Sequence, residues 1–189
     1  MTDARQAGNQ ETTPITQETT QAPREQASAI EWTPKFSFIP IDPKLVIYTT
    51  QHTFAFLSIQ PILPFHTLVV PKRVVQYFSE LTKTEVEDFA ETVQFISKRL
   101  RLSGKGSSVL HNIQDGPQAG QVIKHVHMHL LARNEGDWKA NEARLFQGGK
   151  FDEVSFNIKG ESEWPNADQD VLKRDSEEMF KLLNGPFQE

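Results

Sequence analysis

The chain of 189 residues contains no cysteine. This absence excludes disulfides, thiolate zinc sites and a cysteine nucleophile, so any metal would have to bind to His, Asp or Glu side chains. Positive charge is also scarce, because 20 Lys and Arg residues stand against 25 Asp and Glu residues and the formal net charge is −5. Duplex nucleic acid favours clustered positive charge, so we expect no nucleic-acid partner and keep small nucleotides as candidate ligands.

Long apolar runs are missing as well. No stretch approaches the roughly 20 residues that span a bilayer, and the start of the chain lacks the apolar segment of a secretory signal. We therefore expect no membrane partner and a cytoplasmic location, with the nucleus as a second compartment.

Large aliphatic residues are rare in the first part of the chain. Residues 1–30 are dominated by Gln, Thr, Ala and Glu, with Ile15 and Ile30 as the only large aliphatic residues after Met1. Such a stretch buries too little apolar surface to offset the entropy lost on ordering. The composition predicts a disordered tail over residues 1–33 and one folded domain over 34–189, whose extension from about residue 142 has weaker signals.

Short apolar runs rich in β-forming residues follow the tail. Their brief connections predict antiparallel strands, because a parallel crossover needs a dozen or more residues. The third and fourth runs are separated by a longer segment with a helical pattern, and the last two are joined by a Gly-containing loop that predicts a second hairpin. The five predicted strands cover residues 45–50, 53–59, 66–71, 107–114 and 122–131.

Two helices are predicted from apolar periodicity. Apolar residues recur at three- and four-residue intervals over 83–101, and Thr82 stands three residues before Glu85, which is the spacing of a capping box. Residues 171–183 predict a closing helix that ends at an Asn-Gly-Pro sequence. The strands and helices together indicate an α+β fold.

Three of the six histidines alternate with apolar residues: His125, His127 and His129 are each followed by one. On a helix, steps of two residues would scatter the imidazoles around the axis. On a strand they share one face at intervals of roughly 6.6 Å, since each residue advances about 3.3 Å. The pattern therefore predicts a row of imidazoles on one face of the strand over 122–131.

Such a row has one structural and two chemical interpretations. A purely structural row is disfavoured, because each imidazole would displace a packing residue and demand hydrogen-bond partners. In the first chemical interpretation the imidazoles bind zinc, and an open fourth position activates water. In the second, one imidazole is a nucleophile, since an unperturbed histidine is largely neutral at pH 7 and keeps a lone pair that can attack phosphorus.

The loop before the row favours phosphorus chemistry. Gly116 and Gly120 would let backbone amides approach an anion, and the side-chain amides of Gln114 and Gln121 flank the loop without adding negative charge. Asp115 is the only nearby acid, and in an Asp-Gly turn it is expected to be structural. A zinc site would more typically have carboxylates around its ligands, so metal binding is the weaker interpretation.

These residues resemble the signature of a known family. Residues 125–131 read His-Val-His-Met-His-Leu-Leu, which is similar to the His-x-His-x-His-x-x motif of the histidine triad (HIT) superfamily. The loop over 114–121 resembles the segment before the triad in the fragile-histidine-triad branch, the dinucleoside polyphosphate hydrolases. Further similarities to that branch lie at residues 54–56, 61–64, 66–71 and 136–138, and at Lys124.

The resemblance implies a fold and an activity. The fold would be α+β, with a five-stranded antiparallel sheet, one long helix and a C-terminal helix, and two copies would dimerise into a continuous sheet. The activity would be hydrolysis of dinucleoside polyphosphates such as diadenosine triphosphate into AMP and ADP, through a covalent nucleotidyl-histidine intermediate. No tightly bound cofactor is implied, and a divalent cation, Mg²⁺ or Mn²⁺, would pair with the polyphosphate.

The same resemblance implies roles for individual residues. The catalytic residues would be His125, His127, His129 and Gln121. His127 would attack the α-phosphorus, His125 would hold the hydrogen bonds of the catalytic strand, and His129, if protonated, would stabilise charge on the phosphoryl oxygens. The residues implied to contact or position substrate are Ser58, His66, Gln114, Gly120, Gln121, Val122, Ile123 and His129, and no residue is implied to bind a metal.

Four positions depart from the family pattern. Ser58 stands where relatives have an Asn that contacts ribose, so this side chain reaches less far. Phe65 replaces the Gly before His66, and a positive φ at this position would strain a residue with a side chain. Ala132 replaces a Pro, and Leu145 stands roughly where relatives have a phosphorylatable Tyr.

Two other functions compete with polyphosphate hydrolysis. An adenosine phosphoramidate hydrolase would use the same triad, and the loop before the triad argues against it. A catalytically weak nucleotide-binding signalling protein would bind substrate without rapid turnover, since binding and chemistry use different residues. The departures at Ser58 and Phe65 keep this last hypothesis open.

Overall fold

A computed structural model describes residues 32–137 and 166–186 of the chain. Its main sheet has five antiparallel strands in the order β3-β4-β5-β7-β6, which confirms the predicted α+β class. A separate two-stranded hairpin, β1-β2, was not predicted. The strands are β1 (Lys35–Phe36), β2 (Ile39–Pro40), β3 (Val46–Thr49), β4 (Thr53–Leu57), β5 (Thr67–Pro71), β6 (Ser108–Ile113) and β7 (Met128–Arg133).

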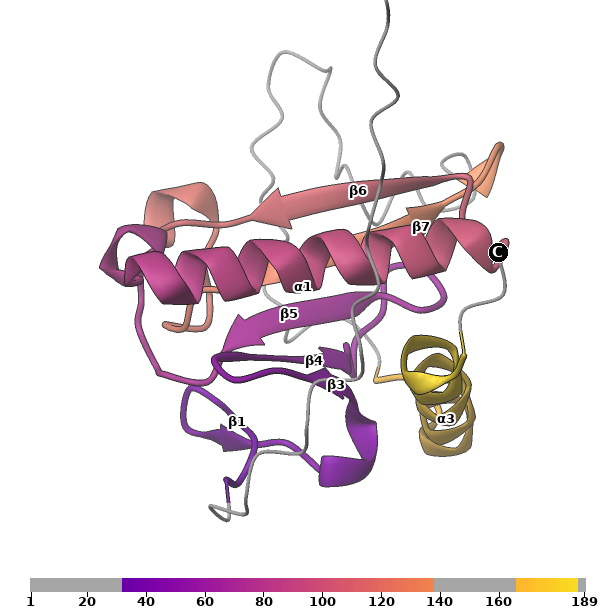
Figure 1. Ribbon diagram of the computed structural model, residues 1–189, viewed down its shortest axis with the longest axis horizontal. Coiled ribbons are helices and arrows are strands. Elements are labelled where there is room, and N and C mark those ends of the chain that lie inside the picture. The colour runs from indigo at the N-terminus through magenta and orange to yellow at the C-terminus, as the bar shows by residue number, and fades with distance from the viewer. Residues whose placement is uncertain (1–31, 138–165, 187–189) are drawn as a thin grey trace, which may run out of the picture. The chain divides into compact units, whose positions relative to one another are not determined.

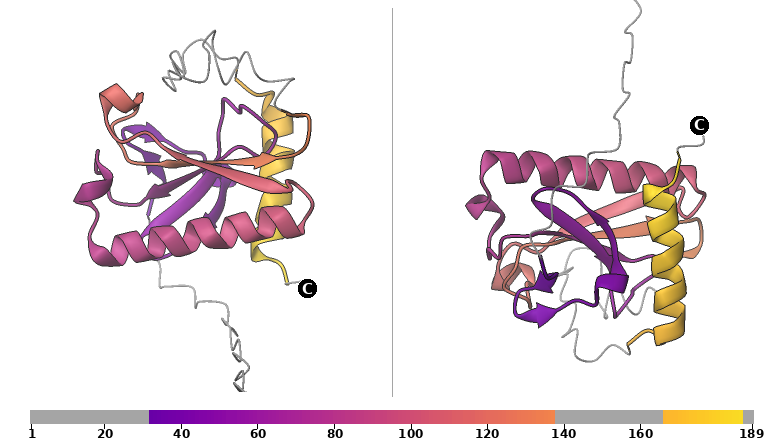
Figure 2. Two further views of the ribbon diagram at one scale, coloured as in Figure 1. Left: turned by 90° about the horizontal axis from the view of Figure 1, so that it is seen from above. Right: turned by 60° about the horizontal axis from the view of Figure 1, so that its bottom comes forward.

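Within the described ranges, two α-helices pack near the sheet, and Figure 1 shows α1 lying along β5, β6 and β7. They are α1 (Lys83–Leu102) and α3 (Gln169–Asn184), and three short 3-10 helices are η1 (Pro43–Leu45), η2 (Phe78–Glu80) and η3 (Pro117–Ala119). α3 runs crosswise to α1 and packs mainly on β3 and η1, as the two further views in Figure 2 show.

The register of the strands gives the sheet two distinct faces. Successive residues of a strand point to opposite sides, so Met128 and His129 at the start of β7 face in opposite directions. His129 pairs with Leu68, which in turn pairs with Phe56, and these three side chains share one side, which we call the histidine face. His111 of β6 lies on the other side, where its ring hydrogen-bonds to Ser97 of α1 at 2.8 Å, and we call that side the helix face.

The start of α1 has the predicted capping box. Thr82 Oγ1 accepts a hydrogen bond from the Glu85 amide at 3.4 Å, and the Glu85 carboxylate accepts one from the Thr82 amide at 2.8 Å. Glu85 also pairs with Arg73 at 2.7 Å, which ties the helix start to the segment after β5. The helix ends at Leu102, close to the predicted end, and Gly104 follows with a φ of +72° that suits glycine.

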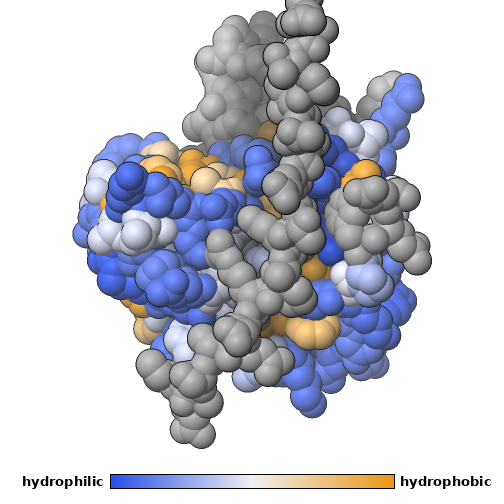
Figure 3. All heavy atoms as spheres, viewed as in Figure 1, coloured by the Kyte–Doolittle hydropathy of each residue, from blue (hydrophilic) through white to orange (hydrophobic). Residues whose placement is uncertain are grey.

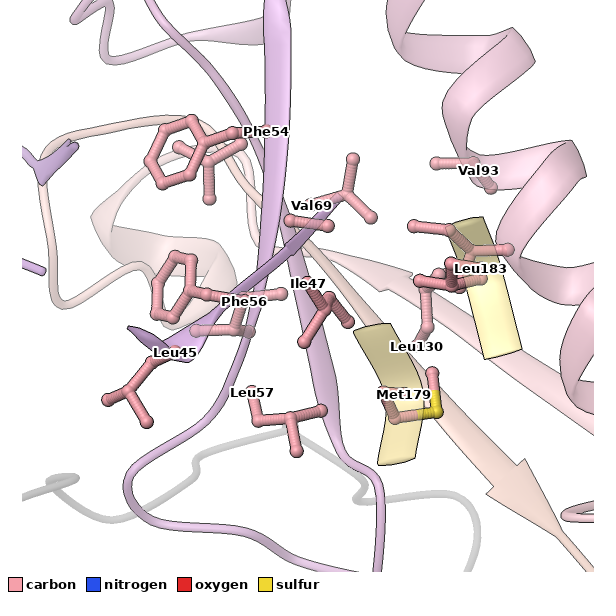
Figure 4. Packing of buried hydrophobic residues seen from close by; sticks show 14 of the residues in the cluster. Leu45, Ile47, Phe54, Phe56, Leu57, Val69, Val93, Leu130, Met179 and Leu183 are labelled. Carbon is pink, nitrogen blue, oxygen red and sulfur yellow. The ribbon is translucent and has the colours of Figure 1, made fainter. Parts of the chain in front are cut away.

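The helix face holds most of the apolar core. Ile96 of α1, Leu130 of β7 and Met179 of α3 are fully buried, and Figure 4 shows Leu130 close to Met179 and Leu183. Burial of this apolar core supplies the main favourable free energy of folding, because each buried large aliphatic side chain contributes about 1.5–3 kcal/mol. The visible surface around α1 is mainly hydrophilic, as Figure 3 shows, in keeping with an amphipathic helix.

Two predicted boundaries need correction. Trp32, which the composition assigned to the tail, packs edge-on against Phe54 with ring centroids 4.9 Å apart, so the packed domain includes residues before 34. The strand predicted over 122–131 begins only at Met128. The predicted disorder of residues 1–31, the departure at Leu145 and most of the extension after residue 142 lie outside the described residues. No described helix is long and apolar enough to cross a membrane.

Candidate active site

The three triad histidines lie together although only one of them belongs to a strand. His125 and His127 precede β7, because the Val126 amide donates to the Val75 carbonyl at 2.8 Å instead of extending the pairing with β5. The rings of His127 and His129 are 4.9 Å apart, and the ring of Phe36 lies 5.8 Å from His125 and 4.8 Å from His127. The predicted row is therefore a cluster held by backbone contacts rather than a regular strand ladder.

The hydrogen bonds of His127 define which of its nitrogens carries the lone pair. Nδ1 lies 2.7 Å from the His125 carbonyl, and a carbonyl oxygen can only accept, so Nδ1 carries the proton. Nε2 is then unprotonated, and within the described part of the chain it has no hydrogen-bond partner although it is buried. A neutral imidazole with a free Nε2 lone pair is a nucleophile.

His66 and His129 form a second hydrogen-bonded unit on the same face. The Ile62 amide donates to His66 Nδ1 at 3.3 Å, so His66 carries its proton on Nε2, which lies 2.9 Å from His129 Nδ1. His129 must accept that bond on Nδ1 and therefore carries its own proton on Nε2. Nε2 of His129 is buried and unpartnered among the described residues, so it offers a hydrogen-bond donor beside the lone pair of His127.

His125 is fixed by backbone groups on both sides of its ring. The Ser37 amide in the β1-β2 turn donates to Nδ1 at 2.9 Å, and Nε2 donates to the carbonyls of Pro71 at 2.9 Å and Arg73 at 3.2 Å. Both nitrogens are thus engaged and the ring is fully buried. His125 can position its neighbour through its carbonyl, which accepts from His127, but it has no free nitrogen for chemistry.

Burial keeps all four imidazoles neutral. Loss of solvent lowers the pKa of His66 to about 3, helped by the nearby His127, and lowers that of His125 to about 4. Burial also lowers the pKa of His127, and it lowers the pKa of His129 well below the ordinary histidine value, with His66 and His127 adding to the effect. The lowered pKa therefore favours a neutral His129 that donates from Nε2 in the free protein, whereas the sequence resemblance assigned charge stabilisation to its protonated form.

The loop before the triad is organised differently from the prediction. The amides of Ala119, Gly120 and Gln121 donate to carbonyls within the loop, at 3.0, 3.0 and 3.1 Å, so they form its turns and do not face outward as an anion cradle. Gly116 and Gly120 have φ of +113° and +88°, values that glycine adopts without strain. Asp115 accepts a bond from the Phe78 amide at 2.8 Å, which confirms its structural role.

The side-chain amide of Gln121 is buried in the loop before the triad. Its Nε2 donates to the Gln76 carbonyl at 2.8 Å, which fixes the orientation of the amide, and its buried Oε1 has no partner among the described residues. Gln114 is also buried. Unpartnered buried polar atoms are rare in folded proteins, and those of His127 and His129 belong to rings only 4.9 Å apart, so we take this part of the histidine face as the candidate functional site.

The other residues implied to bind substrate lie further out. Ser58 is buried at the end of β4, where its Oγ accepts from the Gln60 amide at 3.2 Å and its amide donates to the His66 carbonyl at 2.8 Å. Gly120 is half-buried and Ile123 packs partly against the core, whereas Val122 is 53% exposed. The Val122 side chain is therefore directed to solvent rather than to the imidazoles.

Sequence reasoning missed several groups of this site. Phe36 packs on the nucleophilic ring, and Phe56 and Phe54 extend the aromatic contact away from it, with centroid separations of 5.7 and 5.6 Å. The other missed groups are backbone atoms, which have no residue signature: the Ser37 and Ile62 amides and the carbonyls of Pro71, Arg73 and Gln76. The change of composition near Phe36 was the only available signal.

A metal centre finds no support in this geometry. Among residues 32–137 and 166–186, no group of three or more His, Asp or Glu side chains is arranged to hold a metal ion. The imidazoles bond to one another and to backbone groups, which leaves one acceptor nitrogen on His127 and one donor on His129. This pair suits nucleophilic attack and proton donation better than metal coordination.

Proteins of related sequence share the description bis(5'-adenosyl)-triphosphatase. A bifunctional bis(5'-adenosyl)-triphosphatase/adenylylsulfatase of Arabidopsis thaliana is 37% identical over 139 residues, which cover 74% of each chain. A bis(5'-adenosyl)-triphosphatase of Dictyostelium discoideum is 34% identical over 132 residues, covering 70% of this chain and 81% of the relative.

Solved structures share the fold. A diadenosine triphosphate hydrolase of Plasmodium falciparum, in complex with cyclomarin A, superimposes with a TM-score of 0.63 at 19% identity, covering 88% of this chain and 92% of that one. The NitFhit protein of C. elegans gives a TM-score of 0.63 at 24% identity, covering 82% and 31%. The model of the HIT domain matches residues 41–136. Together with the identity to the curated relatives, this match shows that the chain belongs to the HIT domain family.

Proposed function

We propose that this chain hydrolyses dinucleoside polyphosphates such as diadenosine triphosphate to AMP and ADP, with His127 as the nucleophile. Relatives that are 32–37% identical carry the description bis(5'-adenosyl)-triphosphatase. The observation that carries the proposal is the buried lone pair on His127 Nε2, next to the proton on His129 Nε2. This pair supplies an attacking atom and a donor for the charge that develops on phosphorus.

In the first step, His127 Nε2 would attack the α-phosphorus, and the bond from that phosphorus to the bridging oxygen would break. The products are an adenylyl-His127 and ADP. Negative charge that develops on the oxygens would be stabilised by the Nε2 proton of His129, which costs no reorganisation because His66 already holds the ring. Since Nδ1 of His127 donates to the His125 carbonyl, that bond would also stabilise the positive charge the ring acquires.

In the second step, water would attack the same phosphorus and release AMP, the electron pair of the broken P–N bond would return to His127 Nε2, and one proton of the water would pass to solvent. Gln121 is suited to position this water, because its free Oε1 is an acceptor and the orientation of the amide is fixed by Gln76. Gln114, buried at the start of the loop, is the candidate for contact with the bridging oxygen. Splitting one hydrolysis into two displacements lowers each barrier.

Substrate entry requires movement, because His127 is only 1% exposed. Phe36 packs edge-on against that ring from the β1-β2 hairpin, so we assign the opening motion to this hairpin. For the nucleoside we assign contact to Ser58, to the backbone of Gly120 and to the Val122–Ile123 segment. A divalent cation, Mg²⁺ or Mn²⁺, would accompany the polyphosphate, whose oxygens are its preferred ligands.

We further propose a homodimer formed at β6. This strand is an edge of the main sheet, and nothing among the described residues pairs with its outer side. A hollow of about 360 Å³ between α1 and this edge, lined by Val93, Val109 and Met128 among others, would take apolar side chains of a second copy. Sedimentation equilibrium at micromolar concentration is expected to give twice the mass of the chain, and a monomer would contradict this part of the proposal.

The proposed activity is tested with diadenosine triphosphate, with AMP and ADP separated by chromatography. His127→Asn is expected to remove AMP release while keeping the fold and nucleotide binding. His52→Asn, which changes a histidine outside the cluster, is the matched control and is expected to keep full activity. Unchanged turnover by His127→Asn would remove the nucleophile from the proposal.

A competition experiment separates the alternatives that share this site. The ratio of kcat/KM for diadenosine triphosphate to that for adenosine phosphoramidate is expected to exceed one. A preference for the phosphoramidate would indicate that the chain is an adenosine phosphoramidate hydrolase. Tight binding of substrate without any release of AMP would instead indicate a nucleotide-binding signalling protein.

A further inference from the structure

A strained residue stands directly before His66. Phe65 has a φ of +60°, in the left-handed region that is unfavourable for residues with a Cβ. It occupies the third position of the turn Leu63-Pro64-Phe65-His66, which is closed by a hydrogen bond from the His66 amide to the Leu63 carbonyl at 3.2 Å. Proline at the second position and positive φ at the third are features of a type II turn, in which glycine is preferred at the third.

This turn determines where the His66 ring points. Its last residue begins the segment that leads into β5, and the Ile62 amide within the same connection donates to His66 Nδ1. If Phe65 relaxed to negative φ, the Pro64–Phe65 peptide would rotate and His66 would shift. The bond from His66 Nε2 to His129 Nδ1, which orients the donor of the candidate active site, would then be lost or lengthened.

Packing alone does not enclose Phe65. A hollow of about 540 Å³ lies between the β4-β5 connection and α3, and Phe65 lines it together with Leu63 and Glu178. The ring therefore has free space on one side into which the turn could relax. The conformation needs a specific contact to hold it.

Lys105 provides that contact. Its ammonium lies over the Phe65 ring, 4.3 Å from the centroid, and it also pairs with Glu178 of α3. The backbone of Lys105 is anchored on both sides, because its amide donates to the Leu100 carbonyl at 3.1 Å and its carbonyl accepts from Asn134 at 3.0 Å. Lys105 is thus a fixed cation between the strained ring and α3.

We propose that Lys105 is a positioning residue for the reaction: paired with Glu178, it holds Phe65 in the strained turn and thereby aims His66 at His129. Lys105 touches neither His129 nor the nucleophile, and it acts through the turn. The inference rests on the proposed function for its kinetic consequence, whereas its structural consequence, the His66–His129 bond, is independent of any substrate.

A double-mutant cycle tests the inference. Lys105→Met keeps the aliphatic stem and removes the ammonium, and it is expected to lower kcat about tenfold while KM changes less than about twofold. Phe65→Gly adopts positive φ without strain, so the turn no longer needs the cation. In the Phe65→Gly background, Lys105→Met is therefore expected to change kcat less than about twofold. Equal losses in both backgrounds, or no loss in either, would overturn the proposal.

Two matched variants complete the design. Phe65→Val puts a β-branched residue, which does not tolerate positive φ, into the turn and is expected to lower kcat even with Lys105 present. Lys83→Met, at the exposed start of α1, removes an ammonium that lies 3.7 Å from Glu87 and is expected to leave kcat unchanged. Each kcat is referred to the folded fraction from urea unfolding, so a general loss of stability is not mistaken for misalignment.

Hydrogen exchange at the imidazole gives a readout without substrate. In the unmodified chain, ¹⁵N-resolved NMR is expected to show a slowly exchanging proton on His66 Nε2, because that proton is buried in the bond to His129. Lys105→Met is expected to speed this exchange about tenfold or more, and Phe65→Gly with Lys105→Met to restore it. Exchange that is unchanged in Lys105→Met would refute the inference even if the chain hydrolyses no polyphosphate, and changed exchange without hydrolysis would refute only the proposed function.

Discussion

The two faces of the main sheet use burial for opposite purposes. On the helix face, Val69 and Leu130 belong to the same apolar core as Ile96 of α1, and the buried hydroxyl of Ser97 is hydrogen-bonded to His111. On the histidine face, His66, His127 and His129 are just as buried, and two of their nitrogens have no partner among the described residues. One sheet can therefore pack against helices on one face and hold a reactive group on the other, because the side chains of successive strand residues point to opposite faces.

The largest expected effect is a loss of kcat caused by a change on the histidine face. His127→Asn removes the attacking nitrogen and is expected to lower kcat for AMP release by roughly 10⁴-fold or more, as is typical when a nucleophile is removed. Its free energy of unfolding is expected to change far less than that of a helix-face variant. Product analysis and urea unfolding measure the two quantities on the same sample. A His127→Asn protein that unfolds easily and keeps its turnover would reverse the assignment of the two faces.

The next effect belongs to the helix face. Ile96→Ala leaves a cavity between α1 and the sheet and is expected to lower the free energy of unfolding by about 2–5 kcal/mol. Because Ile96 belongs to α1, which packs on the side of the sheet opposite the histidine cluster, kcat per folded molecule is expected to stay unchanged. Urea unfolding and steady-state kinetics at low temperature check both statements. A selective loss of kcat would show that the two faces are coupled.

The pH dependence of stability reports on the buried imidazoles of the histidine face. Burial lowers the pKa of His66 to about 3 and that of His125 to about 4, so both rings are neutral in the folded chain. In the unfolded chain they bind protons below about pH 6.5. The unfolded state therefore binds more protons, and stability is expected to fall as pH drops from about 6.5 toward 4, by up to roughly 1.4 kcal/mol per pH unit for each such histidine.

Urea unfolding between pH 7 and pH 5 measures that slope. His125→Gln removes one titrating group and is expected to reduce the slope by about one proton. The Arg73 guanidinium lowers the pKa of the Glu85 carboxylate to about 2. Glu85 therefore affects stability only below about pH 4.5 and does not contribute to the slope between pH 7 and pH 5. A stability that stays level from pH 7 to pH 5 would show that the imidazoles are not buried in solution.

The smallest effect concerns the capping residue at the start of α1. Thr82→Ala removes the capping oxygen and is expected to lower the free energy of unfolding by about 1 kcal/mol without changing kcat. The exposed pair of Lys83 and Glu87 is the control, and Glu87→Gln is expected to change stability by less than about 0.5 kcal/mol. Equal losses for the two variants would mean that the cap contributes no more than a surface ion pair.

Local patterns predicted those parts of the molecule that local physics determines. The capping box at Thr82 and Glu85 and the antiparallel pairing of the strands follow from spacing and short connections, and the structure confirms them. Phe65 stands at a family glycine position, where a positive φ would strain a residue with a side chain, and its φ is +60°. In each case the relevant contacts lie within a few residues.

Contacts between distant segments account for what the sequence did not predict. Alternation at His125 and His127 indicated a strand, but the pairing of the Val126 amide with the Val75 carbonyl ends it. The tautomers depend on backbone groups such as the Ser37 amide, which lies 88 residues from His125. Backbone atoms are the same in every residue, so no sequence motif can reveal which of them faces an imidazole.

The most direct test of the central claim follows the enzyme through one turnover. The chain is mixed with diadenosine triphosphate, quenched within milliseconds to seconds, and digested for peptide mass spectrometry under conditions that preserve phosphoramidate bonds. We predict that the mass of one adenylyl group appears on His127, forms before AMP is released, and is absent from His127→Asn. Release of AMP with no modified peptide at any time, or with the group on another residue, would contradict the account.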